Sequence, residues 1–145
     1  MDKRKSMLKI LEQTSRTFYL PIIRLPQGLQ EAVASAYLCM RAIDEIEDHP
    51  DLDPQQKTSL LQSVSLALQG QHSVESFRQE DLSDVFQDLI DVLPEVTLRL
   101  GEWVVLAPSV IAPRVWEATA AMAERMAIWA RRGWSIITEA CLLYT

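Results

Sequence analysis

The sequence predicts a single-domain, all-α protein, and three observations support this. Its 145 residues are 48% hydrophobic and 23% charged, which is the composition of an ordinary globular domain. Apolar side chains recur at three- and four-residue intervals along most of the chain, as they do on one face of an amphipathic helix. No segment shows the apolar/polar alternation between hairpin turns that indicates a strand. The chain also shows no internal repeat and no domain boundary.

Prolines and caps define the helices of the first half of the chain. The residue before a proline avoids the helical region, so the helix that starts at Leu29 should end before Pro50. Asp53 followed by Pro54 is typical of an N-cap with proline at the first helical position, and Gly70 suits the end of that helix. We therefore expect helices over residues 3–15, 29–48 and 54–69, with prolines at 21 and 26 interrupting the segment 17–27.

Apolar spacing predicts three more helices in the second half. They cover residues 81–93, 94–104 and 113–132, with a linker over 107–113. The last of them is apolar on nearly all sides, which is typical of a buried helix. Residues 138–145 then end the chain in an apolar segment with no polar tail, so we expect a chain cut inside a larger helical protein. A short final helix docked on the core is the alternative.

Composition excludes several classes of function. A net charge of -6 argues against nucleic-acid binding, which needs a high density of Lys and Arg. No uncharged apolar stretch is long enough to span a membrane, and no apolar signal core follows the basic N-terminus. The two cysteines, Cys39 and Cys141, form no Cys-x-x-Cys pair, so neither a zinc site nor a disulfide framework is indicated. These features predict a cytoplasmic protein.

One predicted helix carries a phenol, a guanidinium and two carboxylates on one side. At 100° per residue, Tyr37, Arg41, Asp44 and Asp48 fall within about 60° of one another. Because Asp44 and Asp48 are four residues apart, their carboxylates can reach one ligand together.

The end of that helix is unusually acidic. Six acidic residues between positions 44 and 53 have no Lys or Arg among them. Each acid near the negative end of the helix dipole costs about 0.3–1 kcal/mol, and mutual repulsion adds to this. Mg²⁺ binds one or two carboxylates and completes its shell with water and substrate phosphates, so Asp44 and Asp48 suit half of a Mg²⁺–diphosphate site. The alternative is a solvated acidic face, with Arg41 paired to Asp44 or Glu45.

Two further clusters are candidates for substrate contact. Ser15, Arg16, Thr17 and Phe18 lie at the end of the first predicted helix and offer hydroxyls, a guanidinium and a ring, which can bind phosphate oxygens beside an apolar wall. The alternative places Arg16 in solvent and Phe18 in the core.

The second cluster is a stripe on the last helix, formed by Met122, Arg125, Met126 and Trp129. It can form the wall of a long apolar pocket, or it can simply pack in the core.

Taken in order, these segments resemble the squalene/phytoene synthase family. The family opens with Ser-Arg-(Ser/Thr)-Phe and a later Leu-Pro, matched here by residues 15–18 and 25–26. Its Tyr-x-x-x-Arg-x-x-Asp-x-x-x-Asp pattern is matched by Tyr37, Arg41, Asp44 and Asp48. Residues 126–129 and 132–134 resemble its Gly-Met-Ala helix and the following turn, and residues 144–145 resemble the start of the segment that leads to its Val-Ala-Gly motif.

The resemblance implies the N-terminal portion of an all-α isoprenoid synthase fold, with residues 1–145 forming about half of one domain. It implies head-to-head condensation of two prenyl diphosphates, with farnesyl diphosphate as the expected substrate. Asp44 and Asp48 match the first Mg²⁺-binding motif, and the second is expected beyond Thr145. NADPH is implied only if the product is squalene.

The resemblance also implies roles for the other matched residues. Tyr37 and Arg41 match residues at the diphosphate or the reaction centre, and Ser15, Arg16, Thr17 and Phe18 match the diphosphate-binding entry. Met126 and Trp129 match the cavity wall. An oily product makes peripheral membrane contact plausible, and the resemblance implies nothing about oligomeric state.

The sequence departs from the family pattern in two places. Arg125 stands where the family often has Gly, which places a cation on a cavity helix, and residues 140–142 lack the usual acids. With only one acidic motif, we expect the 145-residue chain to be inactive alone. The alternatives are a non-catalytic helical module that binds diphosphate or a partner, and a relative that hydrolyses prenyl diphosphate to the alcohol.

Overall fold

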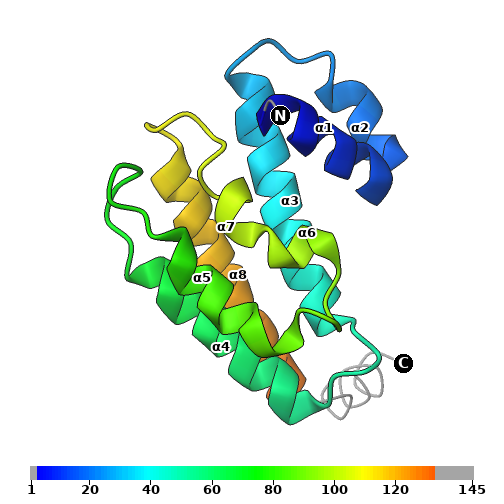
Figure 1. The fold of residues 1–145 in the computed structure, drawn as a ribbon, viewed down its shortest axis with the longest axis vertical. Helices are drawn as coiled ribbons and strands as arrows, with labels where there is room; N and C mark the ends of the chain where they lie inside the picture. Colours follow the sequence, from blue (N-terminus) through cyan, green and yellow to red (C-terminus); the bar gives the residue numbers. More distant parts are fainter. Residues whose placement is uncertain (1–2, 133–145) are drawn as a thin grey trace, which may run out of the picture.

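The structure is a computed structural model and describes residues 3–132. Every regular element in this range is helical, which confirms the all-α prediction (Figure 1). The elements in chain order are α1 (Lys3–Thr14), α2 (Arg16–Ile22), α3 (Leu29–Glu47), α4 (Pro54–Gln69), α5 (Gln79–Phe86), the 3-10 turn η1 (Gln87–Leu89), α6 (Glu95–Leu98), α7 (Leu100–Trp103) and α8 (Ala112–Arg132). None of these described helices is long and apolar enough to cross a membrane.

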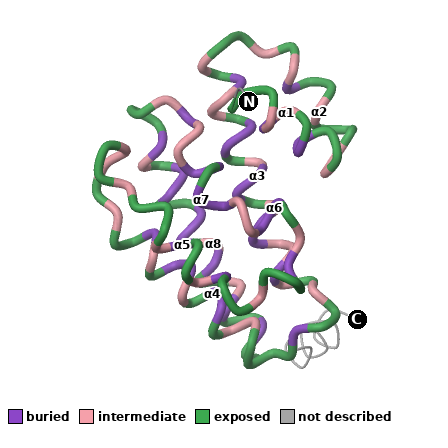
Figure 2. The backbone as a smooth tube through the Cα atoms, viewed as in Figure 1, coloured by how far each residue is buried: buried purple, intermediate pink, exposed green. Residues whose placement is uncertain are grey.

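Three long helices form the body of the molecule. Helices α4 and α8 pack along each other, and α3 packs on α8 and on the short helices α6 and α7. The α1–α2 pair lies against α3 at its N-terminal part (Figure 1). Buried positions gather on the sides of α3, α4 and α8 that face one another (Figure 2). The largest fully buried side chains include Trp103, Phe86, Leu38, Ile43 and Leu61.

The predicted caps and limits are confirmed for the central helices. Helix α4 spans the predicted residues, and its capping box is complete: the Gln56 N–H donates to Asp53 Oδ1 at 2.8 Å, and the Asp53 N–H donates to Gln56 Oε1 at 3.0 Å. Helix α3 ends one residue before the predicted limit, with Asp48 as its C-cap.

Two segments differ from the prediction because local turns interrupt them. Residues 81–93 do not form one helix, since α5 ends at Phe86 and the Leu93 N–H bonds back to the Leu89 carbonyl in a turn. Residues 94–104 divide into α6 and α7 around Arg99, whose ψ of 15° leaves the helical region.

The prediction for helix α8 was also wrong in part. It is buried on one side only, and Ile128 and Trp129 are 42% and 47% exposed. Small residues such as Ala120, Ala123 and Ala127 form its buried stripe, which lets α4 approach closely.

Buried hydroxyls and indoles join elements that are distant in sequence. Ser35 Oγ donates to the Trp103 carbonyl at 2.6 Å, and Thr97 Oγ1 donates to the Ala42 carbonyl at 3.0 Å. Ser65 Oγ donates to the Ala120 carbonyl at 2.9 Å. Each bond satisfies a buried polar group and contributes about 1 kcal/mol. Together they fix the rotation of α3 and α4 relative to their neighbours, and therefore which side chains of α3 face outward.

Candidate active site

The predicted stripe on α3 lies on the outer side of the molecule. Tyr37, Arg41 and Asp44 are half-buried, and Asp48 is exposed at the end of the helix. The opposite side of α3 supplies the buried residues that hold the stripe in place, namely Ala34, Ser35, Leu38, Cys39, Ala42, Ile43 and Ile46. The four predicted residues therefore share one accessible face, as their spacing required.

Arg41 is only partly engaged within the protein. Its Nη2 pairs with Glu45 Oε1 at 2.7 Å, one of the two partners that the sequence allowed. Its Nε is buried and has no hydrogen-bond partner among the described residues. A buried unsatisfied donor costs about 1–3 kcal/mol, so this nitrogen gains stability from any further acceptor that reaches it. The Arg41 side chain as a whole is partly exposed, so its Nη groups keep capacity for an anion beside the aspartates.

The electrostatics show crowded negative charge. The pKa of Asp44 is raised, first by partial burial and then by the charge of Asp48, against an opposing effect of Arg41. The pKa of Glu47 is raised to about 6, mainly because its carboxyl shares a hydrogen bond with Asp48, with burial and the Asp48 charge adding to this. Lys57 of α4 counteracts part of that shift. A bound cation would relieve this repulsion.

The donor set fits half of a Mg²⁺ site. Asp44 and Asp48 offer hard carboxylate oxygens one helical turn apart, and Mg²⁺ accepts one or two carboxylates when water and phosphate complete its shell. No group of three or more acidic, His or Cys side chains that could enclose a metal ion occurs within residues 3–132. The arrangement therefore suits a cation that arrives with a phosphorylated ligand.

A second Asp-x-x-x-Asp spacing occurs at Asp84 and Asp88, and it does not add to this face. Asp84 lies in α5 and Asp88 in η1, where the helical period changes, so the two do not share an α-helical face. Helix α5 packs on α4 and α7.

The serine–arginine–threonine–phenylalanine cluster begins a helix instead of ending one. Ser15 is the N-cap of α2, and its Oγ accepts from the Phe18 N–H at 3.4 Å. Helix α2 continues through Pro21 to Ile22, so this proline did not break it. Arg16, Thr17 and Phe18 are all exposed, which argues against the alternative that Phe18 lies in the core.

The structure brings this cluster to the α3 stripe. The ring of Phe18 lies 4.8 Å from the ring of Tyr37, centroid to centroid, at an interplanar angle of 30°. Such a pair contributes about 0.5–1.5 kcal/mol beyond its burial. Two predicted candidates from different helices therefore meet in space.

Gln30 holds α2 in this position and was not predicted. It is buried, and its Nε2 donates to the carbonyls of Ile22 and Ile23 at 3.2 and 3.1 Å, while its Oε1 accepts from Arg4 Nε at 2.9 Å. Nothing in the sequence shows that this glutamine is buried, so the need of its amide for partners could not be predicted.

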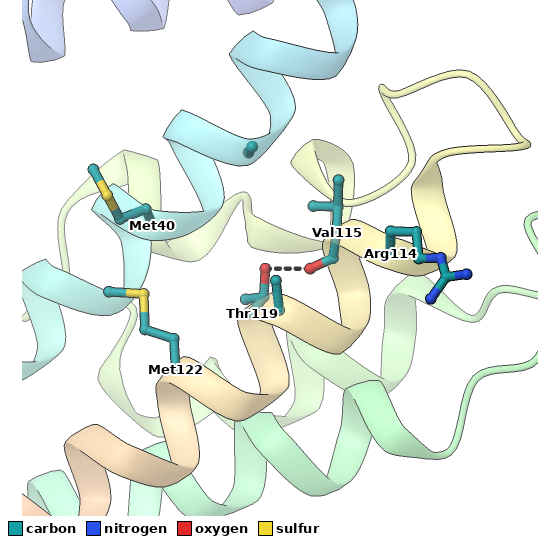
Figure 3. A pocket seen from close by; sticks show the side chains of 7 residues that line it. Met40, Arg114, Val115, Thr119 and Met122 are labelled. Atoms are coloured by element: carbon teal, nitrogen blue, oxygen red, sulfur yellow. Dashed lines mark hydrogen bonds between the residues drawn. The ribbon is translucent and has the colours of Figure 1, made fainter.

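An apolar pocket of about 230 Å³ lies between α3 and α8 (Figure 3). Met40 and Met122 lie on the same side of it, and the Arg114 side chain points away from them (Figure 3). Thr119 stays apolar toward the pocket because its hydroxyl donates to the Val115 carbonyl at 2.7 Å. The pocket is lined by Ala36, Met40, Arg114, Val115, Ala118, Thr119 and Met122.

The α8 stripe contributes less to this pocket than predicted. Of its members, Met122 lines the pocket, whereas Arg125, Met126 and Trp129 are not among the lining residues. Met126 is partly buried and packs against the core. Arg125, which stands where the family often has Gly, is exposed, so its guanidinium lies outside the pocket. Met40, which the sequence also offered as a wall residue, does line the pocket, and it stands one turn from Tyr37 and Asp44 on α3.

Comparison with known proteins assigns this arrangement to a family. The model of the squalene/phytoene synthase family matches residues 11–128. The chain belongs to the squalene/phytoene synthase family. The matched range contains Ser15, Phe18 and the α3 stripe, and it confirms the family resemblance. The fold is accordingly the all-α isoprenoid synthase fold, here in the helices of residues 3–132.

Two curated relatives are similar over part of their length. The squalene synthase of Eremothecium gossypii is 31% identical over 104 residues, which cover 72% of this chain and 22% of that protein. The squalene synthase of Schizosaccharomyces pombe is 40% identical over 53 residues, which cover 37% of this chain and 12% of that protein. No solved structure matches the chain with comparable significance. The motif resemblances at residues 133–134 and 144–145 lie outside the described residues.

Proposed function

We propose that this chain supplies the first acidic motif of a prenyltransferase that joins two prenyl diphosphates head to head. The observation that carries the proposal is the convergence of Asp44, Asp48, Arg41 and Tyr37 on one face of α3, with Phe18 of α2 stacked beside it. The motif lies inside the segment that matches the family. Both relatives named above are squalene synthases, which supports farnesyl diphosphate as the substrate.

Each residue has a role that its surroundings support. Asp44 and Asp48 would hold Mg²⁺, which when bound neutralises the departing diphosphate. Arg41 donates to diphosphate oxygens through its Nη groups, since its side chain is partly exposed, and Arg16, exposed on α2, supplies a second guanidinium. Ser15 keeps its hydroxyl proton for a phosphate oxygen, because its Oγ only accepts from Phe18. Thr17 adds a second exposed hydroxyl.

The surroundings also suit an allylic carbocation. The faces of Phe18 and Tyr37 can stabilise positive charge. Met40 and Met122 provide an apolar wall that excludes water, which would otherwise convert the cation to an alcohol. We also propose that Met126 and Trp129 extend this wall along α8, beyond the pocket. NADPH is needed only if the product is reduced to squalene, and peripheral membrane contact would aid release of an oily product.

The experiment is product analysis with the intact protein that carries this chain. It is incubated with farnesyl diphosphate and Mg²⁺, with and without NADPH, and the extract is examined by mass spectrometry. A thirty-carbon hydrocarbon or a cyclopropyl diphosphate is the expected product. Farnesol alone would instead assign a hydrolase, and unchanged substrate would leave either a prenyl diphosphate of another chain length or the non-catalytic module.

Aspartate variants test the residue assignment. Asp44→Asn and Asp48→Asn should each lower turnover by orders of magnitude while the circular dichroism spectrum stays unchanged. Asp53→Asn is the matched control, because asparagine caps α4 as well as aspartate does and Asp53 lies outside the stripe. Near-normal turnover in both stripe variants would show that Asp44 and Asp48 only form part of a solvated acidic face.

The 145-residue chain alone should show no prenyl transfer, because one aspartate pair cannot close a metal–diphosphate cage. Turnover by the purified chain would contradict this. A module that only binds would retain Mg²⁺-dependent diphosphate binding without any product.

A further inference from the structure

We propose that His49 is a positioning residue, which braces the end of α3 and so fixes Asp48 relative to Asp44. The inference rests on the proposed function, since it concerns the same aspartate pair. His49 itself belongs to none of the motifs that the sequence singles out.

Both ring nitrogens of His49 are engaged. Nε2 lies 2.9 Å from the Val92 carbonyl, which is 43 residues away in sequence. Nδ1 accepts from the Asp51 N–H at 3.1 Å. Because Nδ1 is an acceptor, the ring proton is on Nε2, which donates to Val92. Neither nitrogen is left to bind metal or diphosphate, so any effect of His49 on them passes through neighbouring residues.

The end of α3 needs such a brace. Asp48 is the C-cap, held by the bond from its N–H to the Asp44 carbonyl at 2.9 Å. Helix ends fray, and here the helix dipole and the neighbouring acids both favour separation of the carboxylates. The last turn of α3 contains no basic residue to offset this. If that turn opens, Asp48 leaves the face that it shares with Asp44.

His49 ties this end to the packed segment that follows η1. Val92 itself is exposed, but the next residue, Leu93, is buried, so the acceptor carbonyl is directly linked to a residue fixed in the core. A second tie lies about two turns earlier on α3, where Thr97 Oγ1 donates to the Ala42 carbonyl at 3.0 Å. The segment 92–97 therefore holds α3 at two points, and His49 supplies the one nearest Asp48.

Two substitutions separate the parts of this contact. Asparagine at position 49 keeps a local acceptor for the Asp51 N–H but is too short to reach Val92. Glutamine carries an amide nitrogen as many bonds from Cβ as histidine Nε2, so it can restore the donor to Val92. His72→Ala is the matched control, since His72 is the other histidine and lies exposed, away from α3.

The readouts use the intact protein. The first is the Mg²⁺ concentration that gives half-maximal turnover of farnesyl diphosphate. The second is Mn²⁺ affinity in the presence of inorganic diphosphate, followed by electron paramagnetic resonance. Removing a group that hydrogen-bonds a metal ligand typically costs about 10–100-fold in metal affinity. His49 bonds Val92 and Asp51 and acts on Asp48 through the backbone, so the lower end of this range is the upper limit expected here. We expect His49→Asn to raise the half-maximal Mg²⁺ concentration and to weaken the Mn²⁺ affinity, each by about tenfold. Turnover at saturating Mg²⁺ should stay nearly unchanged, and His49→Gln should be close to wild type in both measurements.

The outcomes are distinct. Unchanged metal dependence in His49→Asn, or a loss of thermal stability without any change in metal affinity, would overturn the proposal. So would a His49→Gln variant as impaired as His49→Asn, because the imidazole itself would then be required. A wild-type protein that binds Mn²⁺ with diphosphate but makes no product would contradict the proposed function, and the Mn²⁺ affinities would still decide the role of His49. A wild type that binds no Mn²⁺ would overturn both.

Discussion

At the end of α3, the acidic side chains of Glu47 and Asp48 repel each other when both are charged and form a hydrogen bond when one is protonated. Glu47 and Asp48 share a hydrogen bond that two ionised carboxylates cannot make, and this raises the pKa of Glu47 to about 6 from a reference value of 4.5. Stability from a raised carboxyl pKa is fully present below the unfolded value and is lost as pH rises through the folded value. Ionised Glu47 therefore destabilises the fold at neutral pH.

Replacing Glu47 by Gln should remove this effect. We expect Glu47→Gln to raise the free energy of unfolding at pH 7 by about 0.5 kcal/mol, a small value because the group is partly exposed and screened. The gain should disappear near pH 4, where the wild-type carboxyl is protonated. Urea denaturation at both pH values measures it. Glu45→Gln is the control with the opposite sign, because it loses the ion pair with Arg41.

Metal binding should depend on pH for the same reason. Mg²⁺ competes with protons for carboxylates, and Asp44 and Glu47 both have raised pKa values. Protonated Glu47 hydrogen-bonds Asp48 and competes with Mg²⁺ for that carboxylate, so the apparent affinity for Mg²⁺ and diphosphate should fall as pH drops through about 6, the pKa of Glu47. The fall should be steeper than in Glu47→Gln, in which only the protonation of Asp44 and of diphosphate itself contributes. Calorimetric titration between pH 5 and 7.5 checks this, and an affinity that does not change over that range would contradict it.

At the scale of helices, sequence signals worked where local chemistry decides the structure. Pro54 and Asp53 determine the start of α4 regardless of its neighbours, and the limits of α4 were predicted correctly. Residues 87–104 were predicted less well, because turns and buried contacts such as the bond from Trp103 Nε1 to the Val96 carbonyl shape them. In the site, too, local spacing could be read from the sequence, and it predicted the α3 stripe. The contacts of Gln30 and His49 could not be predicted, because they depend on partners 7 to 43 residues away.

The turn between α2 and α3 depends on one glycine. Gly28 has a φ of 91° and ψ of -59°, a conformation that L-residues rarely adopt, and its N–H donates to the Glu31 carboxylate. Apart from Gly28 and its two chain neighbours, no residue has an atom within 4 Å of the position that a Cβ would take, so a substitution would be penalised by the backbone conformation alone.

Gly28→Ala should therefore cost about 1–3 kcal/mol and loosen the Phe18–Tyr37 contact. Chemical denaturation measures the stability, and ring-proton chemical shifts report the contact. Gly70→Ala is the control: with a φ of -78° and ordinary contacts for a Cβ, it should be neutral or stabilise by about 0.4–1 kcal/mol. Equal effects of the two substitutions would contradict the role assigned to Gly28.

At the scale of the molecule, α8 serves the core and the pocket at once. Its buried stripe of small residues packs on α4, and Met122 lines the pocket shared with α3. Interiors are close-packed, so a change on the α4 side is transmitted through the rigid helix to the pocket.

Ala123→Leu tests this coupling. Ala123 is fully buried in the middle of the stripe, so added methyl groups should destabilise the fold by about 1–3 kcal/mol and push α8 away from α4 toward α3. That displacement should narrow the pocket beside Met40, and raise KM for a prenyl diphosphate more than it changes turnover by the folded enzyme. Ala121→Leu adds the same volume on the exposed side of α8 and should change neither stability nor KM. If Ala123→Leu lowered stability while KM stayed constant, packing against α4 and the shape of the pocket would be independent, and α8 would not couple them.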